Sequence, residues 1–459
     1  MTSYSGTGTP FLNSVDEHMR EVIRGASVAF FLKLTAAGLG FGLNVVIARY
    51  LGATGAGLYF LALTVTSIAA VLGRAGLDNA LVRFTAANAA IGDWGAVKGL
   101  YTRGLRLALA TSGSVSLAMF VSSSWLAETV FSEPDLTSVM RWMALAVVPF
   151  ALFTLHAHLL KGLKNIRDHI LVLSICLPTI SLIGMVVLVP YWYVRGAACA
   201  YTTASVITLI VGLWCWHRNT SQLRGVKGDF NTRELLRSSM PLFWMSVVQL
   251  VTLWSSTVIL GMWANSSDVG IFGVASRTAR LLSFLLVAVN SIAAPKFAAL
   301  YARGDVMTLE RIARNSASMV TVLAAPMFLL FMIMPRWIMG IFGLEFETGG
   351  LVLSILAVGQ LVNVAAGSAG FVLMMCGYER LMRNTIAICA VISIVSNVLL
   401  IPRLGVVGAG LATVITLSSQ NIIAAVFVWR RLGICTLPTF RRRTVKEVKV
   451  SVTNSSCWE

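Results

Sequence analysis

Charged side chains are scarce in this chain. Asp, Glu, Lys and Arg make up 12% of its 459 residues, about half the share found in an ordinary soluble protein. Hydrophobic residues make up 57%, and the mean hydropathy is +0.80. Acidic residues are the scarcer sign, with 19 Asp and Glu against 36 Lys and Arg, and they lie near the ends of the long apolar runs rather than deep within them. This composition excludes a soluble globular fold and predicts an all-α polytopic membrane protein.

The signatures of enzymatic chemistry are also missing. The seven cysteines form no Cys-x-x-Cys pair and have no histidine at metal-ligand spacing, so no zinc or redox site is expected. The only close histidine pair is His156 and His158, whose side chains diverge on a helix. No phosphate-binding P-loop occurs, which argues against ATP hydrolysis. We expect neither an enzyme nor a cofactor or metal.

Twelve apolar runs are long enough to cross a bilayer, which takes about 20 residues per helix. They are predicted near 28–48, 56–76, 104–126, 139–160, 169–190, 196–216, 241–263, 272–296, 316–340, 349–375, 384–402 and 406–429. The first six form a predicted N-lobe over 28–216 and the last six a C-lobe over 241–429.

Three shorter segments flank or join these lobes. Residues 1–27 lack the apolar core of a signal peptide, so the first span is expected to stay in the mature protein. Within them, 12–26 can form an amphipathic helix on the membrane surface. Residues 217–240 form a linker, and 430–459 a basic tail that anionic lipid would attract.

The positions of the basic residues predict the topology. Most of the 36 Lys and Arg fall in loops on the side that also holds both termini, which the positive-inside rule assigns to the cytoplasm. The net charge of +17 is therefore explained by topology, and no nucleic-acid partner is expected.

The two halves repeat each other. Residues 20–32 (REVIRGASVAFFL) match 233–245 (RELLRSSMPLFWM) at an offset of 213 residues. Further matched pairs at this offset, or within one residue of it, are Gly57 and Gly270, Gly92 and Gly304, and Pro190 and Pro402. Each copy holds an even number of crossings, so the halves share one orientation and are expected to face each other across a cleft, related by a pseudo-two-fold axis along the membrane normal.

Several motifs in these repeats carry a family resemblance. The first half contains IARYLGATGAGLYFLAL and GLDNALVRFTA, and the second contains DVGIFGVASR, APKFAALYARGD and IPRLGVVGAGLATVIT. In this order and spacing, over about 24–432, the chain resembles the polysaccharide exporters of the MATE-like MOP superfamily, in particular the Wzx-type flippases of O-antigen and exopolysaccharide synthesis.

The resemblance implies both a fold and a function. Members have two six-helix lobes in a V and move undecaprenyl-diphosphate-linked oligosaccharide across the inner membrane, with cationic residues lining the central cavity. Membrane lipid, a polysaccharide polymerase and glycosyltransferases are the partners that such a function implies.

Three alternatives stay open. An ion-coupled multidrug or small-molecule antiporter of the same superfamily commonly uses an intramembrane carboxylate, whereas the first span here carries Lys33. A membrane polymerase or ligase typically presents a large external loop, and the outer loops here are short. A scaffolding component of a synthesis complex would need no buried charge.

Two arginines inside the predicted span 272–296 are the main candidates for a binding site. An arginine at hydrocarbon depth costs about 2.5–3.5 kcal/mol on insertion scales, and positions three apart share a helix face. Arg277 and Arg280 are therefore predicted to point into the cleft, about 8–12 Å from the outer end, and to hold a phosphate or acidic sugar. Pairing with backbone carbonyls or snorkelling to the outer interface is the alternative. The first half has Thr64 and Ser67 at the matching positions.

Lys33 and several side-chain amides complete the predicted substrate site. Lys33 lies near the cytoplasmic start of the first span, where it can face the cleft or snorkel. Asn290, on the same span as the arginines, is the first choice for contacting sugar hydroxyls, and Gln249, Gln360 and Asn363 are further candidates. Amides within spans also form interhelical hydrogen bonds, which is the alternative for each of them.

Overall fold

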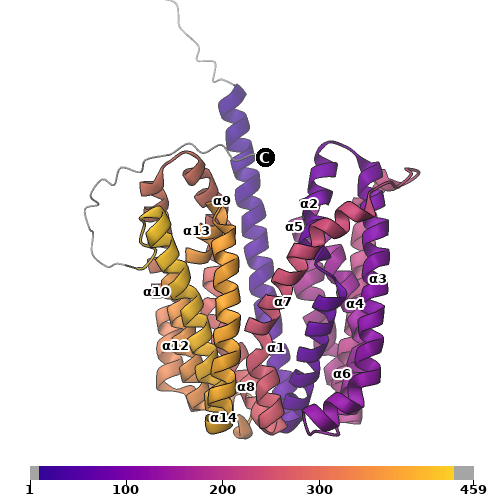
Figure 1. The fold of residues 1–459 in the computed structure, drawn as a ribbon, viewed down its shortest axis with the longest axis vertical. Coiled ribbons are helices and arrows are strands. Elements are labelled where there is room, and N and C mark those ends of the chain that lie inside the picture. The colour runs from indigo at the N-terminus through magenta and orange to yellow at the C-terminus, as the bar shows by residue number, and fades with distance from the viewer. Residues whose placement is uncertain (1–9, 439–459) are drawn as a thin grey trace, which may run out of the picture.

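Two helical lobes meet at one end and separate at the other, like the arms of a V, in the computed structural model of the chain (Figure 1). The structure describes residues 10–438, and it describes side chains from Phe30 onward except at Ala288, Ser291, Ile292 and Pro295. Residues 10–438 contain helices and no strand. The predicted all-α class is therefore confirmed.

Twelve crossings are present within residues 10–438. Nine helices there are long and apolar enough to span a membrane. Three of these are pairs of crossings joined at one non-helical residue, Gly52 (φ 64°), Tyr193 (φ 49°) or Gly405 (φ 55°). The predicted twelve crossings are thus confirmed, and Tyr193 and Gly405 are 212 residues apart, as the repeat requires.

The N-lobe is built around α4, which packs against α1, α3 and α6. Its elements are α1 (Pro10–Gly73), α2 (Leu77–Ala90), α3 (Trp94–Trp125), η1 (Leu126–Val130), α4 (Leu136–Gly162), α5 (Ile166–Ile170), η2 (Leu171–Cys176), α6 (Leu177–Asn219) and η3 (Ser221–Leu223).

The C-lobe is built around α14, which packs against α7 and α12. Its elements are α7 (Thr232–Trp263), α8 (Ser266–Ala279), η4 (Arg280–Ser283), α9 (Phe284–Ala302), α10 (Val306–Ile333), α11 (Pro335–Gly340), η5 (Leu344–Gly349), α12 (Gly350–Ala366), α13 (Ala369–Met375) and α14 (Glu379–Leu432).

Helices extend further toward the open end than hydropathy predicted. The turn between α2 and α3 contains Gly92 (φ 77°), and the turn between α9 and α10 contains Gly304 (φ 72°). In each turn the next residue caps the following helix: Asp93 accepts from Ala96 N at 2.8 Å, and Asp305 accepts from the Thr308 backbone N at 2.9 Å. Apolar runs end where charge begins, but helices continue past that point into the polar region. The matched turns confirm the repeat.

The N-terminal segment differs from the prediction, and part of the predicted C-terminal tail lies outside the described residues. α1 begins at Pro10 and runs without a break into the first crossing (Figure 1), so residues 12–26 continue that helix instead of forming a separate one. Nothing in their sequence ends a helix, since they contain no proline. At the other end α14 stops at Leu432, and the arginine run at 441–443 lies outside the described residues.

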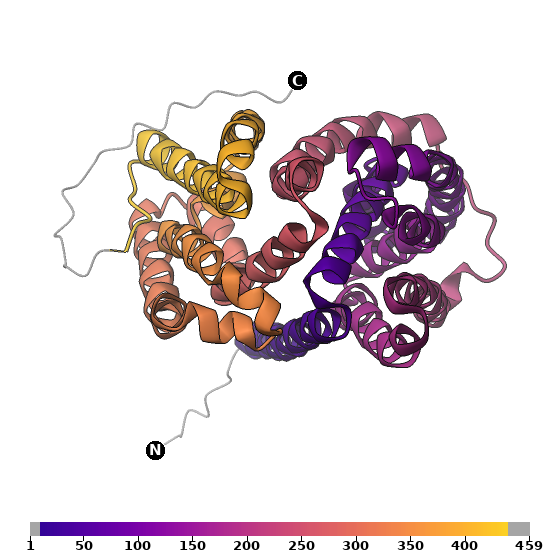
Figure 2. The ribbon, with the colours of Figure 1, turned by 90° about the horizontal axis from the view of Figure 1, so that it is seen from below.

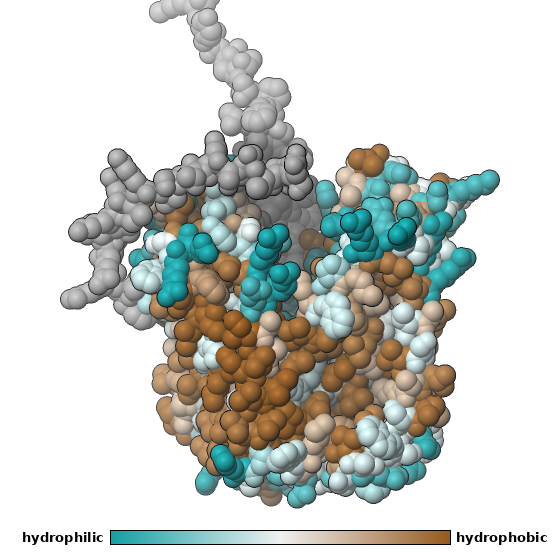
Figure 3. Space-filling model, in the orientation of Figure 1, coloured by the Kyte–Doolittle hydropathy of each residue, from teal (hydrophilic) through white to brown (hydrophobic). Residues whose placement is uncertain are grey.

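A band of apolar side chains covers the middle of the molecule in Figure 3, with hydrophilic side chains above and below it. Large apolar residues such as Val121, Ile183 and Ile333 are exposed within the described chain. Such a surface is stable only against lipid, so the chain is a multi-pass membrane protein.

The lobes join where the second half of α1 crosses α8. A Cβ at Gly57 would lie 1.7 Å from the backbone oxygen of Ser266, and one at Gly270 would lie 2.0 Å from that of Ala53. Gly57 matches Gly270 and Ala53 matches Ser266 in the repeat, so the two contacts are symmetric. Figure 2 shows the lobes on either side of this central region. The crossing therefore lies on the pseudo-two-fold axis.

We expect Gly57→Ala to lower the melting temperature of the purified protein. The added methyl meets backbone that cannot rotate away, and overpacking of this kind costs about 1–3 kcal/mol. Gly113→Ala is the matched control, because nothing lies within 4 Å of a Cβ at that helical position, and alanine favours a helix over glycine. A Gly57→Ala protein as stable as Gly113→Ala would contradict the close crossing.

Candidate functional site

The predicted arginine pair lies on α8 and η4, beside the crossing of the lobes. α8 begins at Ser266, near the closed end, six residues before the predicted start of the span. At 1.5 Å per residue, Arg277 and Arg280 lie about 16 Å and about 21 Å along the helix from Ser266. The predicted distance of about 8–12 Å is counted from residue 272, so the added length is that of the six residues by which α8 begins earlier.

Arg277 contacts the opposite lobe. Its guanidinium carbon lies 3.8 Å from the centroid of the Phe60 ring on α1, and its Nη1 donates to the Gly273 backbone oxygen at 3.0 Å. Gly273 is the repeat partner of Phe60, and a Cβ there would lie 2.3 Å from Cδ2 of the ring. The missing side chain leaves room for Phe60, so a cation–π contact holds Arg277 between the lobes.

Arg280 is exposed although its neighbours are buried. It begins the turn η4, where Ala279 and Leu282 on either side are buried. A 3₁₀ turn between two α-helices often marks a functional hinge. Among the ion pairs of the described residues, none involves Arg277 or Arg280. Both guanidiniums therefore retain N–H groups that an anionic ligand can use.

A chain of polar side chains lies beside η4. Ser283 Oγ donates to Gln360 Oε1 at 2.7 Å, and Asn363 Nδ2 approaches the same oxygen at 3.5 Å. Asn421 Nδ2 donates to Asn363 Oδ1 at 3.1 Å. These contacts join η4 to α12 and α14, so two predicted amides, Gln360 and Asn363, lie together beside Ser283, which is three residues along the chain from Arg280. Primary amides donate and accept, as sugar hydroxyls require.

The other predicted residues do not join this group. Asn290 is 3% exposed and accepts a hydrogen bond from Ser368 Oγ, so it ties α9 to the start of α13. Gln249 on α7 is exposed. Lys33 on α1 is half-exposed and lies about 28 Å above the Gly52 turn, toward the open end.

Two glutamates that the sequence analysis did not select close the lobe interface. Glu133 Oε1 accepts from the backbone N of Ser266 at 3.1 Å and from its Oγ at 2.6 Å. Glu345 Oε2 accepts from the backbone N of Ala53 at 2.7 Å. Each carboxylate thus caps the first turn of a helix that belongs to the other lobe, where the helix dipole favours negative charge.

These caps obey the internal symmetry. Glu133 and Glu345 are 212 residues apart, and Ala53 and Ser266 are 213 apart. Arg49 adds a third link between the lobes, because its Nε donates to the Ile341 backbone oxygen at 2.9 Å. The sequence signal for these glutamates is the repeat offset, which pairs an acidic residue with an acidic residue in the two halves.

This geometry defines a class: an all-helical membrane protein with two pseudo-symmetric lobes. The fold is similar to that of a multidrug resistance MATE family transporter of the MOP superfamily in an inward-facing conformation, with a TM-score of 0.74 and 13% identity over 89% of this chain and 98% of that one. It is also similar to the lipid II flippase MurJ in an inward closed conformation, with a TM-score of 0.70 and 13% identity over 88% of this chain and 87% of that one.

The sequence comparison is more specific. Residues 22–300 match the family model described as polysaccharide biosynthesis protein, and the chain belongs to that family. Over 438 residues it is 23% identical to the probable low-salt glycan biosynthesis flippase Agl15 of Haloferax volcanii, covering 91% of this chain and 87% of that protein.

We expect Glu133→Ala combined with Glu345→Ala to open the closed end. Losing a helix cap costs about 0.5–2 kcal/mol. Losing two should therefore shift the equilibrium between the closed and the opened end by on the order of 2 kcal/mol, about thirtyfold. Spin labels at Thr54 and Leu344, both exposed beside the caps, report the distance between the two lobes at the closed end. This distance is measured by electron paramagnetic resonance in a variant without the native cysteines. A longer-distance population should appear in the double variant.

Glu128→Ala is the control for this measurement. Glu128 is exposed at the same end but makes no hydrogen bond to the other lobe in the described chain, so its replacement should leave the distance distribution unchanged. If the double variant and this control give the same distribution, the caps do not hold the lobes together.

Proposed function

We propose that this protein is a flippase, and not an enzyme, which moves undecaprenyl-diphosphate-linked oligosaccharide across the cytoplasmic membrane for polysaccharide biosynthesis. Membership of the polysaccharide biosynthesis protein family and the similarity to Agl15 support this proposal. The observation that carries it is the arginine pair: Arg277 and Arg280 lie on a membrane-spanning helix, at the joint between the lobes, without a carboxylate partner in the described chain.

A lipid-linked diphosphate matches the chemistry of this region. Its negative charges would cross the hydrocarbon core at high cost unless cations accompany them. A guanidinium presents parallel N–H donors that bind phosphate oxygens in pairs and cannot lose its charge. Arg277 and Arg280 would bind the diphosphate, and Gln360 and Asn363 would contact the first sugars. The lipid tail would remain in the surrounding bilayer.

The transport cycle is alternating access. Both termini and the open end of the V face the cytoplasm, in agreement with the excess of basic residues on that side. Substrate enters from there, where Lys33 on α1 offers an early polar contact, and reaches the arginine pair. Gln249 lies about 21 Å along α7 from Trp263 at the closed end, a distance similar to that of Arg280 along its own helix, and would contact the substrate at that depth. Release outside requires the caps of Glu133 and Glu345 to break while the lobes close at the cytoplasmic end.

The chemistry of the substrate also implies partners. A glycan joined to a lipid diphosphate is assembled by glycosyltransferases on the cytoplasmic side, and a polymerase consumes it on the outer side. These enzymes would supply and remove the substrate at the two faces of the membrane.

We expect Arg277→Ala combined with Arg280→Ala to insert normally and to lose transport. Hydrogen bonds to a charged group are worth about 1.5–3 kcal/mol each, so losing two should slow the rate at least about 100-fold. In proteoliposomes, the measurement is the rate at which lipid-linked sugar becomes accessible to a membrane-impermeant glycosidase. Arg303→Ala, at an exposed arginine of the open-end turn, is the control and should transport like the parent. A fully active double variant would refute the site.

Replacing both arginines with lysine separates geometry from charge. A lysine keeps the charge but not the paired donors, so Arg277→Lys combined with Arg280→Lys should transport faster than the alanine variant and slower than the parent in the same assay. Full activity of the lysine variant would mean that charge alone is sufficient and that paired hydrogen bonding contributes nothing.

A further inference from the structure

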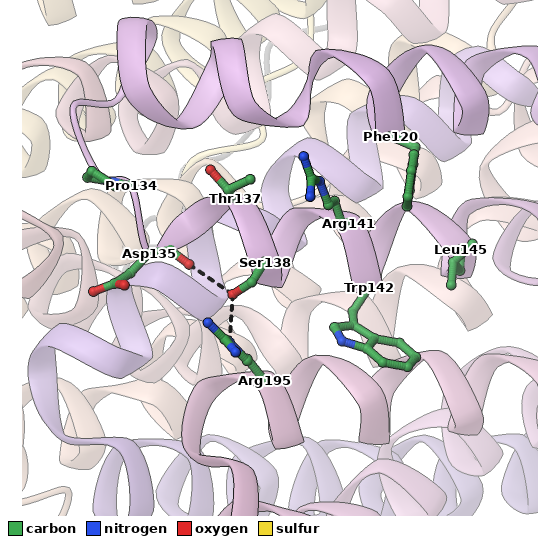
Figure 4. Close-up of a pocket in the computed structure, with 9 residues that line it drawn as sticks. All are labelled: Phe120, Pro134, Asp135, Thr137, Ser138, Arg141, Trp142, Leu145 and Arg195. Atoms are coloured by element: carbon green, nitrogen blue, oxygen red, sulfur yellow. Dashed lines mark hydrogen bonds between the residues drawn. The ribbon is translucent and has the colours of Figure 1, made fainter.

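A pocket lined by two arginines lies at the closed end of the N-lobe. It has a volume of about 450 Å³. Phe120 of α3, Arg141 and Trp142 of α4, and Arg195 of α6 line it, as Figure 4 shows. None of these residues belongs to the arginine pair of α8 and η4, the polar chain beside it or the glutamate caps.

The two arginines of this pocket have only neutral partners in the described chain. Arg195 Nε donates to Ser138 Oγ at 3.0 Å, while Arg141 donates from Nε to Ser123 Oγ at 3.2 Å and from Nη2 to Ser124 Oγ at 3.0 Å. The ion pairs among the described residues do not include either guanidinium. Each arginine is exposed and keeps N–H groups free. The lining also holds the carboxylate of Asp135, so the two guanidiniums leave the pocket with an excess of positive charge.

Apolar side chains line the part of the pocket nearer the middle of the membrane. Phe120, Trp142 and Leu145 are all exposed. Measured along α4 from Leu136, Arg141 lies about 8 Å and Leu145 about 14 Å from the closed end. Positive charge at the membrane interface above apolar surface matches the order of headgroup and acyl chain in a phospholipid, and tryptophan is enriched at that level.

The fold does not require these charges. At the repeat offset of 212, Arg141 matches Leu353 and Arg195 matches Val407, so the C-lobe builds the same elements with apolar residues. The two arginines are a feature of one lobe only, which favours binding over a structural role.

We propose that this pocket binds the phosphate headgroup of an anionic membrane phospholipid, with its acyl chains along Phe120 and Leu145. A volume of about 450 Å³ accommodates a phosphate and its glycerol. The pocket also includes Pro134 and Asp135, which directly follow the cap residue Glu133. A bound lipid would therefore steady the loop that holds the lobes together. Because the closed end faces outward in the proposed function, the lipid would belong to the outer leaflet. Only this choice of leaflet rests on the proposed function.

The test is lipid binding to the purified full-length chain, measured by native mass spectrometry with added phosphatidylglycerol. Arg141→Ala combined with Arg195→Ala should weaken the tightest binding event at least tenfold. Arg403→Ala, which removes an exposed arginine from the α14 turn of the other lobe, should leave binding unchanged. Diacylglycerol with the same acyl chains should not compete, since it lacks the phosphate.

A second variant distinguishes loss of lipid binding from loss of folding. Arg141→Gln combined with Arg195→Gln removes the charge but keeps a side-chain donor for the serine hydroxyls, and it should show the same loss of binding with an unchanged melting temperature. Undiminished phosphatidylglycerol binding by the glutamine variant, or equal competition by diacylglycerol, would overturn the proposal. Arginine-dependent binding of undecaprenyl diphosphate in preference to phosphatidylglycerol would also overturn it, because the pocket would then receive the transported lipid.

Discussion

The close contact of α1 and α8 at Gly57 and Gly270 is the constraint on which the rest of the interface depends. Because neither residue has a side chain, the two backbones approach closely enough for each lobe to cap a helix of the other. The same approach brings Phe60 against Arg277. A bulkier residue at the crossing would separate the lobes, and the cross-lobe hydrogen bonds and the cation–π contact would be lost together.

The interface combines a buried apolar core that runs through both lobes with polar cross-lobe contacts at the closed end. The carboxylate caps among these contacts can exchange for water at a cost of about 0.5–2 kcal/mol each. Glu133 lies in the loop before α4 and Glu345 lies in η5, so movement of either lobe breaks both caps at once. The proposed phospholipid beside Pro134 and Asp135 would add to the stability of the same closed end.

Sequence reasoning predicted the fold more completely than the site. Hydropathy and the repeat offset predicted twelve crossings in two matched lobes, because both depend on periodic patterns that the bilayer imposes. The start of the eighth crossing was predicted six residues late, since polar residues at 266–268 begin α8 before its apolar run. Asn290 resembled an available amide in the sequence but is buried against Ser368. Tertiary partners of this kind leave no pattern in a single sequence.

The most direct test of the central claim is a structure of the protein in a lipid nanodisc with undecaprenyl-diphosphate-linked oligosaccharide bound. The account predicts density for the diphosphate within hydrogen-bonding distance of the guanidiniums of Arg277 and Arg280, with the first sugar beside Gln360 and Asn363. Diphosphate density elsewhere in the cleft, with Arg277 still stacked on Phe60 and Arg280 free of ligand, would contradict it.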